Sequence, residues 1–187
     1  YLPKSMVKLH NSILPISAKG TWIFDNMNNK YLDFTSGIGT LSTGHSHPYI
    51  ISKVTEQLPK IIHCQQQIFK SHPPQIELVE KMLTILPKDL DKLFFTNSGS
   101  EAIDNAIKIA RKYTNKNNII AMNGGFHGRT IAALSVTSSN LFCKQNTQPL
   151  SGIFFCSDFN KESIDKIFLN QSSPQDTAAI ILEPVLG

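Results

Sequence analysis

The second half of the chain alternates between short apolar runs and segments with helical periodicity. Apolar runs long enough for buried strands occupy residues 93–96, 118–122, 152–156 and 178–183. Helix-period patterns lie between them, at residues 99–113, 130–138 and 161–169. Because strands that alternate with helices favour a parallel or mixed sheet covered by helices, this half is predicted to form an α/β domain.

The first half has smaller elements. TWIFD and KYLDF flank the turn-like cluster NMNN, which predicts a β-hairpin over Thr21–Phe34. The Gly-rich, polar stretch Ser36–Pro48 is typical of a loop, and helical patterns follow at residues 47–61 and 73–86. The second of these helices carries an apolar stripe that we expect to belong to the core.

Composition narrows the function classes. The chain has 187 residues, of which 41% are hydrophobic and 17% charged, and a net charge of +4 from scattered lysines. It has neither a basic run with interleaved aromatics nor an apolar run of membrane length, so neither nucleic acid nor a membrane is an expected partner. The three widely spaced cysteines, Cys64, Cys143 and Cys156, favour a reducing compartment. With no targeting segment visible, we expect the cytoplasm or the mitochondrial matrix.

The first candidate site lies in LFFTNSGSEAIDNAIKIAR, residues 93–111. Ser98 and Glu101 form the sequence of a capping box, which places Gly99 and Ser100 in the first helical turn. Backbone N–H groups there lack intrahelical partners and lie at the positive end of the helix dipole, so they can bind a phosphate. The spacing is neither G-x-G-x-x-G nor a P-loop, and taken alone it fits equally a helix start that binds nothing.

The second candidate site is NGGFHGRT, residues 123–130, directly after the apolar run 119–122. An aromatic, a histidine and an arginine share this Gly-rich loop at a strand end. Ligands of α/β proteins bind at the carboxyl edge of the sheet. A flat aromatic beside a phosphate seat suggests a planar, phosphorylated cofactor.

Four motifs, in this order, resemble the class III (ω-amino acid) aminotransferases, with 4-aminobutyrate aminotransferases as the most similar members. They are YLDFTSGIGTLSTGHSHP, TNSGSEAIDNAIKIAR, GGFHGRT and IILEPVLG. The resemblance implies pyridoxal 5′-phosphate as cofactor and the fold type I of such transferases: a mixed, mostly parallel sheet with helices on both faces. It also implies a division into the N-terminal part of a small domain, residues 1–60, and the first part of the large domain, residues 61–187. The substrates would be a 4-aminobutyrate-like donor and a keto acid such as 2-oxoglutarate, and the complete protein would be a homodimer.

The resemblance also assigns roles in cofactor binding. Gly99 and Ser100 would donate backbone N–H groups to the phosphate, and Phe126 would stack on the pyridine ring, with an ordinary core aromatic as the alternative. His127 would stack beside the ring or cap the loop. Glu183 would line the cofactor pocket, either as an electrostatic or as a structural group, and Leu186 stands where the family usually has Gln.

For the substrate, Arg129 would clamp a carboxylate, since a guanidinium fork suits a carboxylate and stays charged; a structural salt bridge is the alternative. Ile38 would lie at the substrate pocket, against simple packing. His45 and His47 have no nearby Cys or carboxylate in the sequence, so we favour a structural loop over a metal pair and expect no metal.

The family's Schiff-base lysine and the aspartate that partners the pyridine nitrogen are expected downstream of Gly187. The stretch is therefore interpreted as the front part of an aminotransferase, inactive by itself. The alternatives are a truncated, inactive remnant and an acetylornithine- or ornithine-type aminotransferase; an aminomutase or decarboxylase on the same fold is less favoured.

Overall fold

The computed structural model describes residues 13–65, 71–139, 144, 146–158 and 160–186. The chain divides into two compact units, Tyr1–Lys81 and Met82–Gly187, each described by itself. The predicted division at residue 60 concerns the complete protein and stays a prediction. Cys143 lies outside the described residues. No helix in the described ranges is both long and apolar enough to cross a bilayer.

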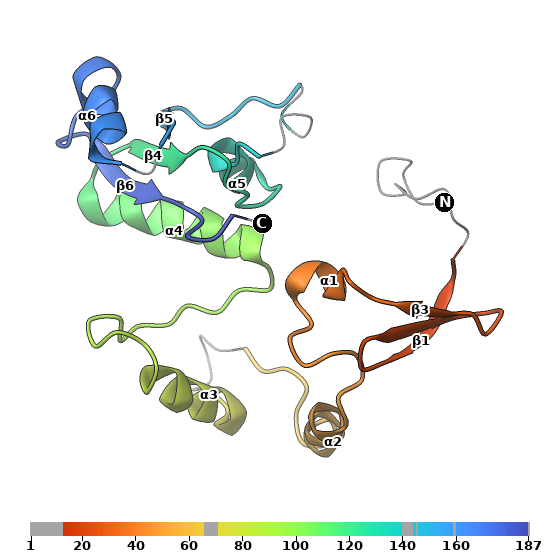
Figure 1. Ribbon diagram of the computed structural model, residues 1–187. Coiled ribbons are helices and arrows are strands. Elements are labelled where there is room, and N and C mark those ends of the chain that lie inside the picture. Colours follow the sequence, from red (N-terminus) through yellow and green to blue (C-terminus); the bar gives the residue numbers. More distant parts are fainter. Residues whose placement is uncertain (1–12, 66–70, 140–143, 145, 159, 187) are drawn as a thin grey trace. The chain divides into compact units, whose positions relative to one another are not determined.

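The N-terminal unit contains a three-stranded antiparallel sheet and three helices (Figure 1). The elements are β1 (Pro15–Lys19), β2 (Trp22–Asp25), β3 (Lys30–Leu32), α1 (Ser36–Gly39), α2 (Pro48–Gln57) and α3 (Pro73–Leu83). The predicted hairpin is confirmed, because β2 pairs antiparallel with β3. β1, which pairs with β2, was missed, since PISAK is short and weakly alternating.

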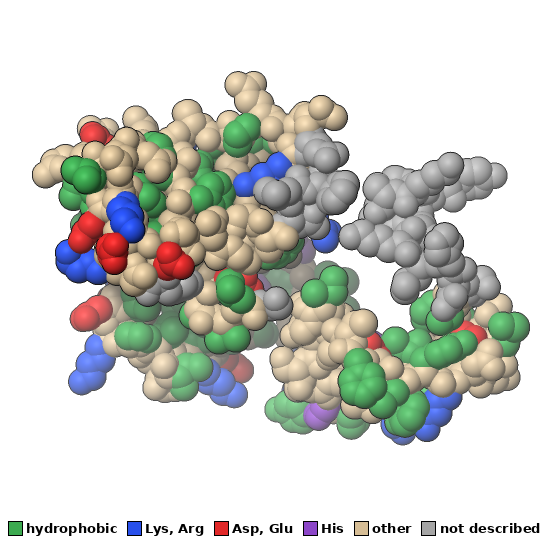
Figure 2. All heavy atoms as spheres, turned by 45° about the horizontal axis from the view of Figure 1, so that its top comes forward, with side chains coloured by type: hydrophobic (Ala, Val, Ile, Leu, Met, Phe, Trp, Pro, Cys, Tyr) green, Lys and Arg blue, Asp and Glu red, His purple; other side chains and the backbone are tan. Residues whose placement is uncertain are grey.

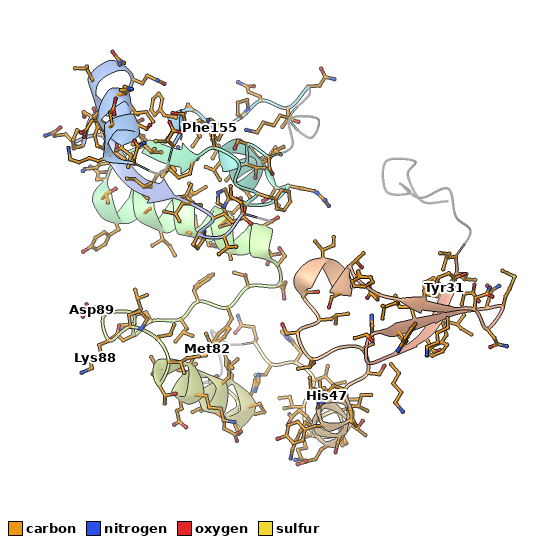
Figure 3. All side chains as sticks on the ribbon, viewed as in Figure 1. Tyr31, His47, Met82, Lys88, Asp89 and Phe155 are labelled. Carbon is orange, nitrogen blue, oxygen red and sulfur yellow. The ribbon has the colours of Figure 1, made fainter. Side chains whose placement is uncertain are left out.

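Asp25 closes the hairpin turn. The residue is 1% exposed, and its carboxylate accepts hydrogen bonds from Met27 N, from Asn29 N and Nδ2, and from the hydroxyl of Tyr31 on β3 (Figure 3). These bonds hold the pKa of Asp25 below its ordinary value, with the Asn29 side chain as the main cause. A buried charge needs such partners, so this turn is specified by a single side chain.

Two expectations in this unit need correction. The helix predicted over 47–61 ends at Gln57, because Pro59 has no N–H with which to continue it. The apolar stripe of α3 is not core: none of its residues is buried. The unit is too small to enclose these faces, and Figure 2 shows green apolar side chains spread over its surface.

The C-terminal unit is a parallel sheet in the order β5-β4-β6 with helices on both faces. Its elements are α4 (Gly99–Thr114), β4 (Asn118–Met122), α5 (Ile131–Val136), β5 (Ile153–Cys156), α6 (Lys161–Asn170) and β6 (Thr177–Ile181). The predicted α/β architecture is confirmed, with element bounds close to those expected.

Alternate residues of β4 form the two halves of the core. Ile119 and Ala121 pack with Ile107 of α4 and Val136 of α5. Ile120 and Met122 face the other way, toward Cys156 and Ile167 of β5 and α6. Because successive strand residues point to opposite faces and both faces are covered, β4 must be apolar from Ile119 to Met122, as its sequence is.

The strand predicted over residues 93–96 is wrong. These residues pair with no strand in the described part of the chain, and Phe94 is 68% exposed. An apolar run becomes a strand only where it pairs with a neighbour through backbone hydrogen bonds, and in the described residues β5 and β6 each pair with β4 alone, not with residues 93–96.

Candidate functional site

The start of α4 presents free backbone donors, as its sequence predicts. Ser98 is the N-cap, and its hydroxyl accepts from Glu101 N at 3.2 Å. The Glu101 carboxylate accepts from Asn97 N at 2.8 Å, which closes the capping box one residue earlier than usual. In the described residues, the N–H groups of Gly99 and Ser100 have no acceptor. An atom added at the Cβ position of Gly99 would meet nothing within 4 Å, so a ligand has room to approach.

The loop between β4 and α5, residues 123–130, folds against this helix start. Arg129 N donates to Ser100 Oγ at 3.1 Å. Gly128 makes that approach possible: its φ is +139°, and a Cβ there would overlap Ser100 Oγ and come within 2.9 Å of Ala133 Cβ. Two stretches far apart in sequence therefore form one surface at the carboxyl edge of the sheet.

The Glu183 carboxylate holds the 123–130 loop by a second hydrogen bond. Glu183 lies two residues beyond the end of β6, and its Oε2 accepts from Phe126 N at 2.9 Å. Since β4 and β6 are parallel, both carry their following residues to the same sheet edge. This hydrogen bond fixes the position of the loop, and the electrostatic and structural roles of Glu183 in a cofactor pocket both stay predictions.

His127 is buried beneath the loop. Its backbone N–H donates to Thr137 Oγ1 at 2.9 Å, and Thr137 Oγ1 donates to Ala133 O at 2.8 Å. Its Nε2 is buried and has no hydrogen-bond partner among the described residues. Burial lowers the pKa of His127, against a smaller opposing effect of Glu183, so the imidazole is neutral near pH 7.

Phe126 and Arg129 form the exposed part of the loop. The Phe126 side chain is 45% exposed, so it is not the ordinary core aromatic of the alternative interpretation. The Arg129 guanidinium lies 5.8 Å from the centre of the Phe126 ring. No carboxylate in the described residues pairs with Arg129, which leaves its five donors for a ligand.

The structure thus brings six of the predicted site residues into one region: Gly99, Ser100, Phe126, His127, Arg129 and Glu183. Ile38 belongs to the N-terminal unit, where it is 89% exposed. His45 serves the loop structurally, with its Nε2 2.7 Å from Asp33 Oδ2. Among the described residues, no group of three His, Cys, Asp or Glu side chains is arranged to hold a metal.

The sequence interpretation missed three residues that shape this site: Gly128, Asp104 and Thr137. Asp104 Oδ1 accepts from Thr130 Oγ1 at 3.0 Å and from Ala133 N at 2.8 Å, which ties α4 to the start of α5. A signal existed for Asp104, because it follows Ser100 by four residues and so shares its helix face. Nothing in the sequence marks Thr137, because its role depends on the loop placing the His127 N–H, ten residues earlier, against its hydroxyl.

Replacing Thr137 by Val is expected to lower the free energy of unfolding of the full-length protein by about 1–3 kcal/mol. The shape is kept, but the buried N–H of His127 loses its acceptor. Urea unfolding measures the change, and Thr137→Ser, which keeps the hydroxyl, is the control. Equal urea midpoints for the Val and Ser variants would show that the Thr137 hydroxyl does not stabilise the protein as the acceptor of the His127 N–H.

Comparison with known proteins supplies the context for this site. The family model of class-III aminotransferases matches residues 5–187. The chain is 36% identical to 5-aminovalerate aminotransferase DavT of Pseudomonas putida, with 100% of this chain and 46% of that protein covered. It is 38% identical to an acetylornithine aminotransferase of Methanopyrus kandleri (92% and 42% covered) and 35% identical to 4-aminobutyrate aminotransferase GabT of Escherichia coli (100% and 46%).

A solved structure agrees with the fold. The adenosylmethionine-8-amino-7-oxononanoate aminotransferase of Methanocaldococcus jannaschii superposes with a TM-score of 0.87 at 28% identity, covering 100% of this chain and 44% of that one. The chain therefore spans a little less than half the length of the relatives it matches.

Proposed function

Because the chain belongs to the class-III aminotransferase family, we propose that the full-length protein carrying it transfers the amino group of an ω-amino acid to a 2-keto acid with pyridoxal 5′-phosphate. The observation that carries this proposal is the approach of the 123–130 loop to the start of α4, through Arg129 N and Ser100 Oγ. It sets free backbone donors, a half-exposed aromatic ring and an unpaired guanidinium side by side.

The residues present fit the cofactor. Gly99 and Ser100 offer N–H groups without acceptors, where a phosphate would be held by the helix start. The Phe126 ring would face the pyridine ring. Glu183 would keep Phe126 in place, because its carboxylate accepts the backbone N–H of that residue. The buried, unpartnered Nε2 of His127 remains available as a neutral donor or acceptor. Bound pyridoxal phosphate supplies an electron sink for the bonds at the amino-bearing carbon.

Arg129 would orient the donor. A guanidinium in this position binds the distal carboxylate of an ω-amino acid through two parallel hydrogen bonds and fixes the amino end by the length of the carbon chain. The keto acid acceptor, proposed to be 2-oxoglutarate, presents a carboxylate of the same kind. We propose further that the protein is a homodimer, which light scattering of the full-length protein would test.

The proposal is tested by incubating the full-length protein with pyridoxal phosphate, 2-oxoglutarate and either 4-aminobutyrate or 5-aminovalerate. Formation of glutamate supports the proposal. Absence of glutamate with every ω-amino donor and with acetylornithine overturns it.

Replacing Arg129 by Lys is expected to raise KM for 4-aminobutyrate on the order of 10-fold or more, because an ammonium cannot reproduce the bidentate bond. An amine donor of similar length without a carboxylate is the matched control, and its KM should change little. An equal rise in KM for both donors would show that Arg129 does not bind the donor carboxylate.

An acetylornithine-type activity is the second candidate, and the 38% identity to the Methanopyrus kandleri protein favours it. Acetylornithine carries an α-carboxylate and an acylated nitrogen in addition to its terminal amine. The ratio of kcat/KM for acetylornithine and 4-aminobutyrate therefore decides between the two.

A further inference from the structure

The first turn of α5 is capped by a side chain from another helix. Thr130 is the N-cap residue of α5, but its hydroxyl accepts no backbone N–H of that helix. The hydroxyl donates instead to Asp104 Oδ1 on α4 at 3.0 Å, and the same oxygen accepts from Ala133 N in the first turn of α5 at 2.8 Å. Asp104 therefore makes the bond that an N-cap side chain ordinarily makes.

Two features tie Asp104 to this task. Ala133 is fully buried, so its N–H has no water to bond if the carboxylate is removed. Lys108 lies one turn further along α4, yet in the part of the chain that the structure describes no ion pair joins it to Asp104. The charge of Asp104 thus stands at the positive end of the α5 dipole, where a carboxylate is favourable.

The same contacts hold the backbone of Arg129 on both sides. Its N–H donates to Ser100 Oγ at 3.1 Å, and the next residue, Thr130, is bonded to Asp104. Ser100 and Asp104 are four residues apart and so share one face of α4. The loop is therefore fixed against α4 at two successive residues, which sets the direction in which the Arg129 side chain leaves the backbone.

The Arg129 guanidinium depends on this support. No carboxylate in the described residues pairs with it, and the centre of the Phe126 ring, on the same loop, lies 5.8 Å away. A binding group held only from its backbone end is misplaced when that backbone shifts, and a misplacement of about 1 Å costs up to about 100-fold in rate. We infer that Asp104 is a positioning residue, which caps α5 in place of Thr130 and thereby holds the Arg129 guanidinium toward the carboxylate of a bound ligand. This inference rests on the proposed function.

The test compares two donors in the full-length protein. Asp104→Ala should raise KM for 4-aminobutyrate on the order of 10-fold with little change in kcat, because the weakened interaction binds substrate and transition state alike. KM for an amine of similar length without a carboxylate should stay near its wild-type value. Asp104→Asn keeps an acceptor oxygen for both bonds and should restore KM for 4-aminobutyrate. In an Arg129→Lys background, Asp104→Ala should raise KM no further, since both changes act on one guanidinium.

Asn160→Ala is the matched control, because Asn160 Oδ1 caps α6 of the same unit through an equivalent bond from Ser163 N at 2.8 Å. It should lower the urea midpoint as Asp104→Ala does but leave KM for both donors unchanged. If Asp104→Ala fails to fold, Thr130→Val carries the comparison, because it removes the hydroxyl and keeps the bond from Ala133 to Asp104. KM for 4-aminobutyrate should rise in this variant too. A rise in KM that is equal for the two donors, or equal in Asn160→Ala, overturns the inference.

Glutarate binding separates this inference from the proposed function. In glutarate a carboxylate replaces the amino group of 4-aminobutyrate, so the molecule can bind at Arg129 but has no amino group to transfer. Its dissociation constant, measured by calorimetry on the full-length protein in the presence of pyridoxal phosphate, should rise on the order of 10-fold in Asp104→Ala and stay unchanged in Asn160→Ala. An unchanged dissociation constant in Asp104→Ala, or a wild type that binds no glutarate, overturns the positioning role whether or not the protein transfers amino groups. Binding that weakens in Asp104→Ala, in a protein whose wild type forms no glutamate with any donor, supports the positioning role and overturns the proposed function alone.

Discussion

Replacing Gly99 by Asp is expected to raise the dissociation constant of pyridoxal phosphate by about 100- to 1,000-fold in the full-length protein. The new carboxylate would stand in the first turn of α4, where we place the phosphate. Two like charges about 4 Å apart repel by about 4 kcal/mol at the effective dielectric of a protein surface.

The same substitution should not harm folding, which makes the result specific. An added Cβ at Gly99 meets nothing within 4 Å, and a negative charge in the first turn of a helix is favourable for the helix itself. The apo protein should therefore unfold at the same urea concentration as wild type or at a higher one. Gly99→Asn, with the same shape and no charge, is the control for binding. An Asp variant that binds the cofactor as tightly as the Asn variant would place the phosphate elsewhere.

The parts of this site that the sequence predicted are those specified by neighbours in the chain. The capping box is decided by Ser98 and Glu101 alone, and both make the expected kind of bond. The hairpin depends on a turn cluster of four residues. The buried strand β4 follows from an unbroken apolar run, whose bounds matched the structure.

The parts that failed depend on partners distant in the sequence. Residues 93–96 have the composition of a strand, yet whether such a run joins a sheet depends on pairing with a distant strand, and in the described residues the sheet β5-β4-β6 does not include them. The pairing of Asp33 with His45 joins the end of the predicted hairpin to a loop that the sequence describes only as Gly-rich. The absence of a metal at His45 and His47 stays a prediction, and the partner of His45, Asp33, was not identified from the sequence.

Gly128 illustrates why such contacts escape a sequence interpretation. In NGGFHGRT it is one of three glycines, and nothing marks it as different. In the structure it lies directly against α4, since a Cβ there would overlap Ser100 Oγ and lie 2.9 Å from both Ser100 Cβ and Ala133 Cβ.

Replacing Gly128 by Ala is therefore expected to lower the free energy of unfolding by roughly 2–5 kcal/mol, from overpacking together with left-handed backbone strain. It should also weaken cofactor binding, because the loop must move away from Ser100 and would carry Phe126 and Arg129 with it. Urea unfolding and cofactor titration of the full-length protein measure the two effects.

A second substitution tests the cause. Ser100→Gly removes two of the three atoms that the new methyl group would meet, so Gly128→Ala/Ser100→Gly should recover part of the lost stability relative to Gly128→Ala. Cofactor affinity should stay low in the double variant, because the bond from Arg129 N to Ser100 Oγ is lost with the hydroxyl. Gly99→Ala is the control for adding a methyl group to a glycine at this contact. Gly99 directly precedes Ser100, and a Cβ there meets nothing within 4 Å, so the unfolding midpoint should be unchanged. A Gly128→Ala protein that unfolds like wild type would contradict the packing of this loop on α4, and with it the geometry on which the proposed cofactor site depends.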